Sequence, residues 1–162
     1  MARNKPPVTP AVRFLKAAGV LFTPHEYRYQ DKGGTAVAAS ELAVDEHQVI
    51  KTLVFEDEHR RPFLVLMHGD RQVSTKNLAR QLNTKTVTPC DPVRAEKHTG
   101  YKVGGISPFG TIKKLPVYLE QTVLDLPRVI INGGRRGLLF DISSQDLVRV
   151  LAATPIHAAL ER

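Results

Sequence analysis

The 162-residue chain is poor in several residue types that would point to a particular class of protein: it has one cysteine, no tryptophan and only 6% aromatic residues. The single cysteine, Cys90, excludes an internal disulfide framework and fits a reducing compartment. Scarce aromatic side chains argue against broad stacking platforms for single-stranded nucleic acid. No apolar run approaches the roughly 18 residues of a membrane span, and the basic N-terminus leads into no apolar signal core. We therefore expect a cytoplasmic protein without membrane attachment.

The common catalytic motifs are missing as well. Six histidines are scattered without H-x-x-x-H spacing, so we expect no metal site, and no glycine motif has the spacing of a nucleotide cofactor fingerprint. There is no G-x-S-x-G elbow for a nucleophilic serine. Cys90 precedes Asp91-Pro92 at an expected helix start, where a thiolate pKa could be lowered, but we favour a structural role for it. An enzyme with this sequence would act by positioning its substrate rather than through a strong nucleophile.

The charge balance is strongly basic. Lys and Arg number 23 against 16 Asp and Glu, which gives a net charge of +7 and a pI near 9.8. A basic surface attracts polyanions and raises the rate of encounter with nucleic acid. Many small basic domains never meet RNA, so charge alone leaves nucleic acid and plain solubility both open.

The order of patterns predicts an α+β protein with a mixed, largely antiparallel, curved sheet and surrounding helices. We expect a loose basic arm over residues 1–8 and a single domain over residues 9–162. Helices are predicted from residues 9–10 to 19, 35 to 42, 74–75 to 82, 91–92 to 100 and 143–144 to about 151, with one turn at 45 and a short last helix from 154–155. Strands are predicted at 22–29, 50–55, 63–67, 86–88, 117–119, 128–131 and 138–142.

The most unusual stretch lies between His98 and Gly110, where four glycines occur within eleven residues. Glycine lets a backbone approach a ligand closely, and successive N–H groups of such a loop can form a concave site for an anion or a carbonyl. A pair of tight turns is the simpler interpretation of a bare Gly-Gly. The length of the loop, its apolar flanks and the Lys113-Lys114 pair that follows it favour a ligand-binding loop.

Two further places could meet a ligand. Lys51 begins a buried strand, from which its ammonium could reach a cleft at the edge of the sheet and bind a phosphate or a ribose hydroxyl; a lysine among aliphatics more often extends to solvent. Arg135 and Arg136 lie in a glycine-rich segment between two strands, and a hairpin turn is the default interpretation of this segment. The two arginine side chains could also contact phosphate.

Three segments together resemble a known family. They are Gln48-Val49-Ile50-Lys51-Thr52-Leu53, Thr99-Gly100-Tyr101-Lys102-Val103-Gly104-Gly105-Ile106-Ser107-Pro108, and Asn132-Gly133-Gly134-Arg135-Arg136-Gly137-Leu138. The chain resembles the YbaK-type Cys-tRNA(Pro) deacylases of the prolyl-tRNA synthetase-associated editing domain superfamily, from residue 9 almost to the C-terminus. The third segment departs from the family, which commonly has serine where this chain has Asn132. The lysine and the glycine loop, at this separation in the sequence, are together specific for the family, whereas either feature alone would be weak evidence for it.

The resemblance implies the roles of particular residues. Lys51 matches the family's essential lysine, which is thought to anchor the terminal adenosine of the tRNA. The substrate loop, whose backbone holds the aminoacyl group, corresponds to Gly104, Gly105, Ile106, Ser107 and Pro108. Tyr27 and Thr52 fall at pocket positions, and Asp141 lies near an acidic pocket position.

The resemblance also implies a reaction without a metal or cofactor. The substrate would be cysteine misattached to tRNA(Pro), edited alongside prolyl-tRNA synthetase, and the substrate's own thiol would attack its ester and leave as a cyclic thiolactone. Three alternatives remain. The protein could remove another amino acid such as alanine, it could be a non-catalytic module that binds the tRNA acceptor end, or it could be a small enzyme that acts on a phosphate ligand. The sequence does not indicate an oligomer, and we take a monomer as the default.

Overall fold

The computed structural model describes residues 7–160, so most of the expected N-terminal arm lies outside the described residues. The helices are α1 (Pro10–Ala17), α2 (Gly34–Leu42), α3 (Thr75–Leu82), α4 (Pro92–Thr99) and α5 (Ser144–Leu151), with 3₁₀ turns η1 (Glu46–Gln48) and η2 (Gln121–Asp125). The strands are β1 (Thr23–Glu26), β2 (Val49–Asp57), β3 (Pro62–His68), β4 (Val87–Pro89), β5 (Val117–Glu120), β6 (Arg128–Arg135), β7 (Leu138–Ser143) and β8 (Thr154–Ile156).

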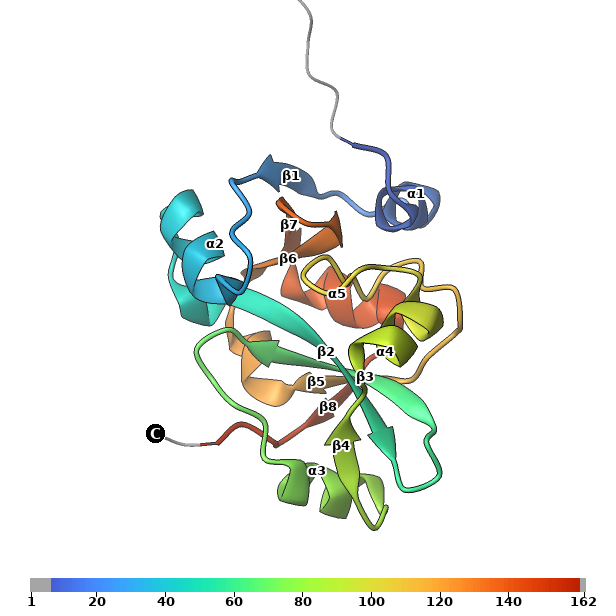
Figure 1. Cartoon of the computed structure of the whole chain (residues 1–162). Helices are drawn as coiled ribbons and strands as arrows, with labels where there is room; N and C mark the ends of the chain where they lie inside the picture. Colours follow the sequence, from blue (N-terminus) through green and yellow to red (C-terminus); the bar gives the residue numbers. More distant parts are fainter. Residues whose placement is uncertain (1–6, 161–162) are drawn as a thin grey trace, which may run out of the picture.

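All of these strands join one mixed sheet in the order β1-β7-β6-β2-β3-β5-β8, with β4 paired to β2 outside this path. Within residues 7–160, four pairings are antiparallel and three are parallel. Helices lie around the sheet, with α2 near the start of β2 and α4 beside its other half (Figure 1). The prediction of a mixed α+β fold with surrounding helices is confirmed, and no described helix has the length and apolar character to cross a bilayer.

Helix starts follow the capping residues of the sequence. Thr9, Ser74, Asp91 and Ser143 each accept a hydrogen bond from a backbone N–H in the first turn, as the N-cap pattern predicts. Thr35 does not cap α2, because it lies inside that helix and its hydroxyl donates to the Glu46 carboxylate at 2.7 Å instead.

The prediction of a last short helix at residues 154–155 is wrong. Thr154–Ile156 is the strand β8, which runs parallel to β5 and forms an edge of the sheet. A Thr-Pro pair suits an edge strand as well as a helix start. Proline has no backbone N–H to donate, and an edge strand tolerates this because the N–H groups on its outer side have no partner strand.

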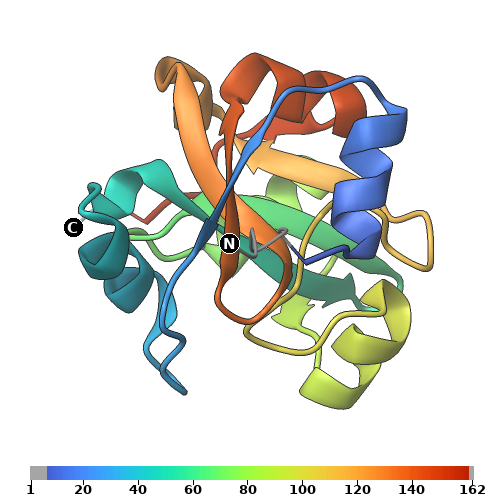
Figure 2. The ribbon, with the colours of Figure 1, turned by 90° about the horizontal axis from the view of Figure 1, so that it is seen from above.

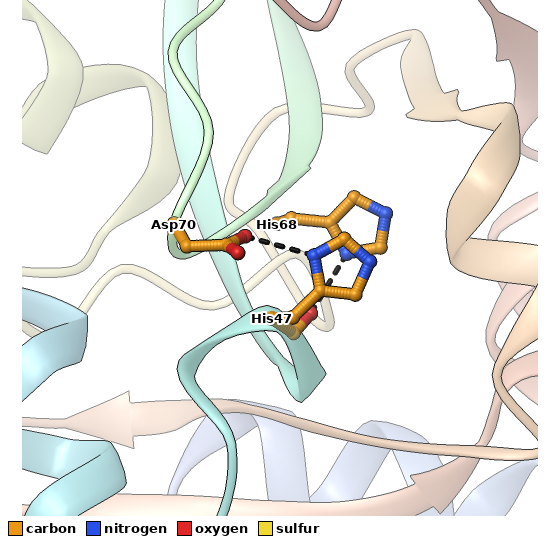
Figure 3. A group of neighbouring side chains, drawn as sticks. All are labelled: His47, His68 and Asp70. Carbon is orange, nitrogen blue, oxygen red and sulfur yellow. Dashed lines mark hydrogen bonds and ion pairs between the residues drawn. The ribbon is translucent and has the colours of Figure 1, made fainter. Parts of the chain in front are cut away.

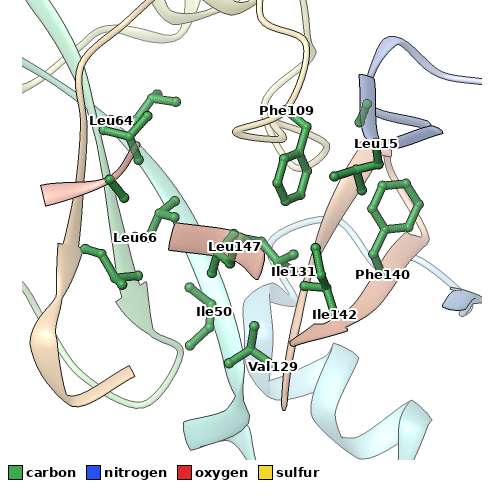
Figure 4. Close-up of a cluster of buried hydrophobic side chains, with 14 of the residues drawn as sticks. Leu15, Ile50, Leu64, Leu66, Phe109, Val129, Ile131, Phe140, Ile142 and Leu147 are labelled. Carbon is green, nitrogen blue, oxygen red and sulfur yellow. The ribbon is translucent and has the colours of Figure 1, made fainter. Parts of the chain in front are cut away.

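The main core lies between the sheet, α1, α5 and the glycine-rich loop. Leu15 of α1 and Leu147 of α5 are fully buried against β6 and β7, and Phe109 of the loop is buried in the same cluster (Figure 4). Viewed from above, α1 lies against one side of the molecule, close to the hairpin of β6 and β7 (Figure 2). The loop that precedes Phe109 is therefore anchored to the core at its far end.

Candidate active site

A cleft of about 680 Å³ opens beside β2. Its lining comes from residues 27–38, residues 49–55 of β2, residues 72–75, residues 89–95 at the start of α4, residues 103–106, and residues 132–139 of the β6–β7 hairpin. The sheet supplies the floor, and segments far apart in the sequence supply the walls. The predicted lysine and part of the predicted glycine loop line this one cleft.

Lys51 lies on the floor of the cleft in β2 and is half-buried. Burial lowers the pKa of its ammonium group, and the nearby carboxylates of Glu46 and Asp70 offset only part of that shift. Both carboxylates also bond to other groups, since the Thr35 hydroxyl donates to Glu46 and the His47 ring donates to Asp70. The cleft thus holds a half-buried cationic donor on its floor.

The glycine-rich loop is held at both ends by buried residues. Tyr101 is 4% exposed, and its hydroxyl donates to the Phe109 carbonyl across the loop. Burial raises the pKa of the Tyr101 phenol to about 12, so the hydroxyl stays protonated and remains a donor. Ser107 is fully buried and accepts a hydrogen bond from the Phe109 N–H at 3.3 Å. These contacts give the loop one defined path past the cleft.

Two glycines allow the loop to lie against Tyr29 and the β6–β7 hairpin. Gly104 has φ +91°, and a Cβ there would lie 2.5 Å from the Tyr29 hydroxyl. A Cβ on Gly105 would lie 2.8 Å from the backbone nitrogen of Arg136 and 2.9 Å from the Arg135 carbonyl carbon. Any side chain at Gly105 would therefore push the loop and the hairpin apart.

Side chains of the hairpin hold the carbonyls of the loop. Asn132 Nδ2 donates to the Gly104 carbonyl at 3.1 Å, and Arg136 Nε donates to the Val103 carbonyl at 2.9 Å. The Arg136 guanidinium also lies 5.3 Å from the centre of the Tyr29 ring. The contact of Asn132 with the loop was not predicted from the sequence, and Arg136 was interpreted as a hairpin-turn residue that could also touch phosphate.

The carbonyls of Lys102, Val103 and Gly104 accept hydrogen bonds, but several donors of the loop have no acceptor among residues 7–160. Within the described part of the chain, no protein group accepts a hydrogen bond from the backbone N–H of Gly104, Ile106 or Ser107. Backbone N–H groups fixed in this way are suited to stabilise a developing oxyanion.

His47, His68 and Asp70 form a cluster of neighbouring side chains (Figure 3), and the charge of Asp70 acts on Lys51. The two imidazole rings stack with centroids 3.6 Å apart, and His47 Nδ1 donates to Asp70 Oδ1 at 2.9 Å. His68 is fully buried, with Nδ1 against the His47 carbonyl at 2.7 Å and Nε2 against the Thr122 hydroxyl at 2.8 Å. Both His68 nitrogens are therefore hydrogen-bonded within the protein, so we interpret the cluster as structural although its ligand-type atoms lie within 4.8 Å of one another.

This cluster was not predicted from the sequence, because its histidines lack helical ligand spacing. The available signal was the β2–β3 hairpin, in which Ile50 pairs with His68. That register brings the residues just before β2 close to the residues just after β3.

Cys90 also lines the cleft, between the end of β4 and the start of α4. Burial raises the pKa of its thiol, with Arg94 opposing the shift only in part. The helix start therefore does not activate the thiol, because the cost of burying a thiolate outweighs the nearby positive charge.

A model of the aminoacyl-tRNA editing domain matches residues 31–150, which include the floor of the cleft, the glycine loop and the hairpin. The chain belongs to this family.

Relatives of the editing-domain protein include a stand-alone protein and part of a larger enzyme. A protein of Enterococcus faecalis named "Putative Cys-tRNA(Pro)/Cys-tRNA(Cys) deacylase EbsC" is 26% identical over 141 residues, which cover 86% of each chain. A proline–tRNA ligase of Streptococcus equi subsp. equi is 29% identical over 99 residues, which cover 61% of this chain and 16% of the ligase. A solved structure titled "Crystal structure of a putative trans-editing enzyme for prolyl tRNA synthetase" has a TM-score of 0.82 at 23% identity and covers 96% of this chain and all of that chain, which shows the shared fold.

Of the nine site residues that the family resemblance implies, the structure brings five into the lining of the cleft, namely Lys51, Thr52, Tyr27, Gly104 and Ile106. Tyr27 is partly buried, and burial raises the pKa of its hydroxyl, with Tyr29 adding to the shift.

The other four lie outside the lining. Gly105 and Ser107 are buried behind the loop surface, and Pro108 follows them into the core. Asp141 lies on β7, where it accepts a hydrogen bond from Arg128 Nε at 2.6 Å. Its carboxylate thus has a structural partner away from the cleft.

Proposed function

We propose that this editing-domain protein is a deacylase that releases cysteine from misacylated Cys-tRNA(Pro). Lys51 would anchor the terminal adenosine in the cleft, and the backbone of Gly104–Pro108 would hold the aminoacyl group, with Tyr27 and Thr52 on the wall. Membership of the editing family and the name given to the Enterococcus relative support this substrate.

One observation carries the proposal: a half-buried ammonium and a loop whose Gly104 and Ile106 N–H groups have no acceptor among residues 7–160 line the same cleft. The ammonium suits a ribose hydroxyl or a phosphate, and the N–H groups suit the ester oxygen on which charge develops. Losing one such donor costs on the order of 10²-fold in rate in other enzymes.

The reaction proposed needs no nucleophile from the protein. The thiol sulfur of the bound cysteine attacks its own ester carbonyl carbon and forms the new C–S bond. The bond from that carbon to the ribose oxygen then breaks, and the thiol proton ends on the ribose oxygen. The products are a cyclic thiolactone and a free tRNA end. A well-held intramolecular attack can reach effective molarities of about 10⁵–10⁸ M. Because the substrate supplies the nucleophile, the reaction does not need an activated Cys90, and burial indeed raises the pKa of the Cys90 thiol.

We expect the protein to act on tRNA in the cytoplasm, as a monomer that meets prolyl-tRNA synthetase. Matching segments within several proline–tRNA ligases support this partner, and the net charge of +7 supports attraction to the acceptor stem.

Deacylation of Cys-, Ala- and Pro-charged tRNA(Pro), with the released product identified by mass spectrometry, tests the proposal. We expect multiple turnovers on Cys-tRNA(Pro) and a thiolactone product. Free alanine released from Ala-tRNA(Pro) as the main activity would contradict the cysteine assignment, and tight binding without turnover would contradict a catalytic role.

A further inference from the structure

The cleft runs along the edge of a strand, not only across its face. Side chains of a strand alternate between its two faces, so a cleft on one face would be lined by every second residue. Here seven consecutive residues of β2, from Val49 to Phe55, line the cleft. Such continuous lining requires that the cleft reach the backbone of β2 itself.

Two backbone hydrogen bonds establish which residues of β2 turn toward this edge. The Gly69 N–H donates to the Val49 carbonyl at 2.7 Å on the β3 side, so the odd-numbered residues of β2 bond to β3. The Cys90 N–H donates to the Val54 carbonyl at 2.9 Å on the opposite side. The even-numbered Thr52 therefore directs its backbone N–H and C=O away from β3.

No strand pairs with Thr52 on that side. The parallel pairing with β6 ends at Ile50, opposite Ile131, where a bulge after Asn132 turns β6 away. The pairing with β4 begins only at Phe55, opposite Pro89. Continuing that register would place Pro92 opposite Thr52, and proline has no N–H to donate.

The Thr52 side chain has a second unused polar group. Its Oγ1 is buried and has no hydrogen-bond partner among the described residues. Most buried polar groups in proteins are satisfied, so an orphaned hydroxyl beside an unpaired peptide group indicates a place where a ligand completes the bonding.

The length of the gap limits what can fill it. β6 closes it on one side and β4 on the other, so it admits one residue-sized unit and not a longer peptide strand. An antiparallel partner residue would donate an N–H to the Thr52 carbonyl and accept from the Thr52 N–H through its own carbonyl. An aminoacyl ester carries this pair of groups, since its α-amino group and ester carbonyl are joined through one Cα.

We propose that the Thr52 peptide group binds the aminoacyl unit of the substrate as a missing strand residue. The Thr52 carbonyl accepts from the free α-amino group, and the Thr52 N–H donates to the ester carbonyl. The site therefore selects aminoacyl esters with an unmodified α-amino group, whichever side chain they carry. This inference rests on the proposed deacylase function.

Substrate analogues test the contact with the amino group. Short RNA helices that carry the tRNA(Pro) acceptor stem are charged with cysteine, with N-acetylcysteine, and with 3-mercaptopropionate, which lacks the amino group without adding bulk. Each enzymatic rate is divided by the spontaneous hydrolysis rate of the same ester. We expect the two analogues to react at least about tenfold more slowly than the cysteinyl ester, as for the loss of a hydrogen bond in a buried site.

Substitution of Thr52 tests the contact with the carbonyl. Thr52→Pro removes the N–H that faces the cleft and spares the bonds to β3, as proline is tolerated where an edge N–H is unpaired. Thr52→Val is the matched control, because it removes the hydroxyl but keeps the N–H. We expect Thr52→Pro to have at least about tenfold lower kcat/KM than Thr52→Val, with both variants shown to be folded by circular dichroism.

A third measurement on the wild type does not depend on folding of the proline variant. Saturation with an amide-linked cysteinyl adenosine, which is not hydrolysed, should shift the Thr52 amide proton resonance downfield. Equal normalised rates for all three esters, or an unmoved Thr52 amide, would overturn the inference while leaving deacylase activity intact. Failure to release any amino acid from any charged RNA would instead overturn the proposed function, and this inference with it.

Discussion

Gly105→Ala is expected to damage activity far more than its small size suggests. The added Cβ would lie 2.8 Å from the Arg136 backbone nitrogen, and ordinary contacts begin at 3.4 Å. Because the obstacle is backbone, the loop and the β6–β7 hairpin must separate to make room, which shifts Gly104 and Ile106 in the cleft. Overpacking of this kind costs typically about 1–3 kcal/mol of stability, and a misplacement near 1 Å can cost on the order of 10²-fold in rate.

The assay is deacylation of Cys-tRNA(Pro) together with thermal unfolding. We expect kcat/KM to fall about ten- to hundredfold while Tm falls by only a few degrees, roughly 2–4 °C per kcal/mol for a chain of this size. Gly19→Ala is a matched control, because Gly19 has φ +68°, nothing within 4 Å of its Cβ position and no place in the cleft. It should lose similar stability, about 1–2 kcal/mol, and keep its activity. Wild-type kcat/KM in Gly105→Ala would refute the close-approach argument.

Three further results are expected. Cys90→Ser should leave the deacylation rate largely unchanged, since burial raises the pKa of the Cys90 thiol and the substrate supplies the sulfur; complete loss of turnover would show otherwise. Asn132→Ala removes the bond to the Gly104 carbonyl and should slow deacylation about five- to tenfold, as for a net hydrogen bond of about 1 kcal/mol, without unfolding the protein. Burial lowers the pKa of His68 below 6.5, so the unfolded chain binds a proton that the native state excludes, and stability should fall as the pH drops below about 6.5. Tm measured between pH 7.5 and 5 should show a shallower slope in His68→Gln than in the wild type, and an equal slope would contradict this assignment.

The elements that local chemistry determines were predictable from the sequence. Helices capped by Thr9, Ser74 and Ser143 begin where their capping residues predict, because an N-cap bond forms within one turn. The β2–β3 hairpin was likewise predictable from two apolar runs joined by a polar turn.

Elements that depend on distant partners were not predictable. β8 exists because Thr154–Ile156 lies alongside β5, which a Thr-Pro pair cannot signal by itself. The cluster of His47, His68 and Asp70 depends on the hairpin register, and the clamping of the loop by Asn132 depends on a bulge in β6. The gap opposite Thr52 depends on where two other strands stop, which no local pattern of β2 contains.

The central claim is that Lys51 and the glycine loop form one deacylation site, and the most direct test is multiple-turnover deacylation of Cys-tRNA(Pro) by Lys51→Ala beside the wild type. Because Lys51 is half-buried on the cleft floor and burial disfavours its charged form, its removal should leave Tm nearly unchanged. We predict that turnover nearly disappears while the variant stays folded. A folded Lys51→Ala protein that deacylates at the wild-type rate would contradict the account.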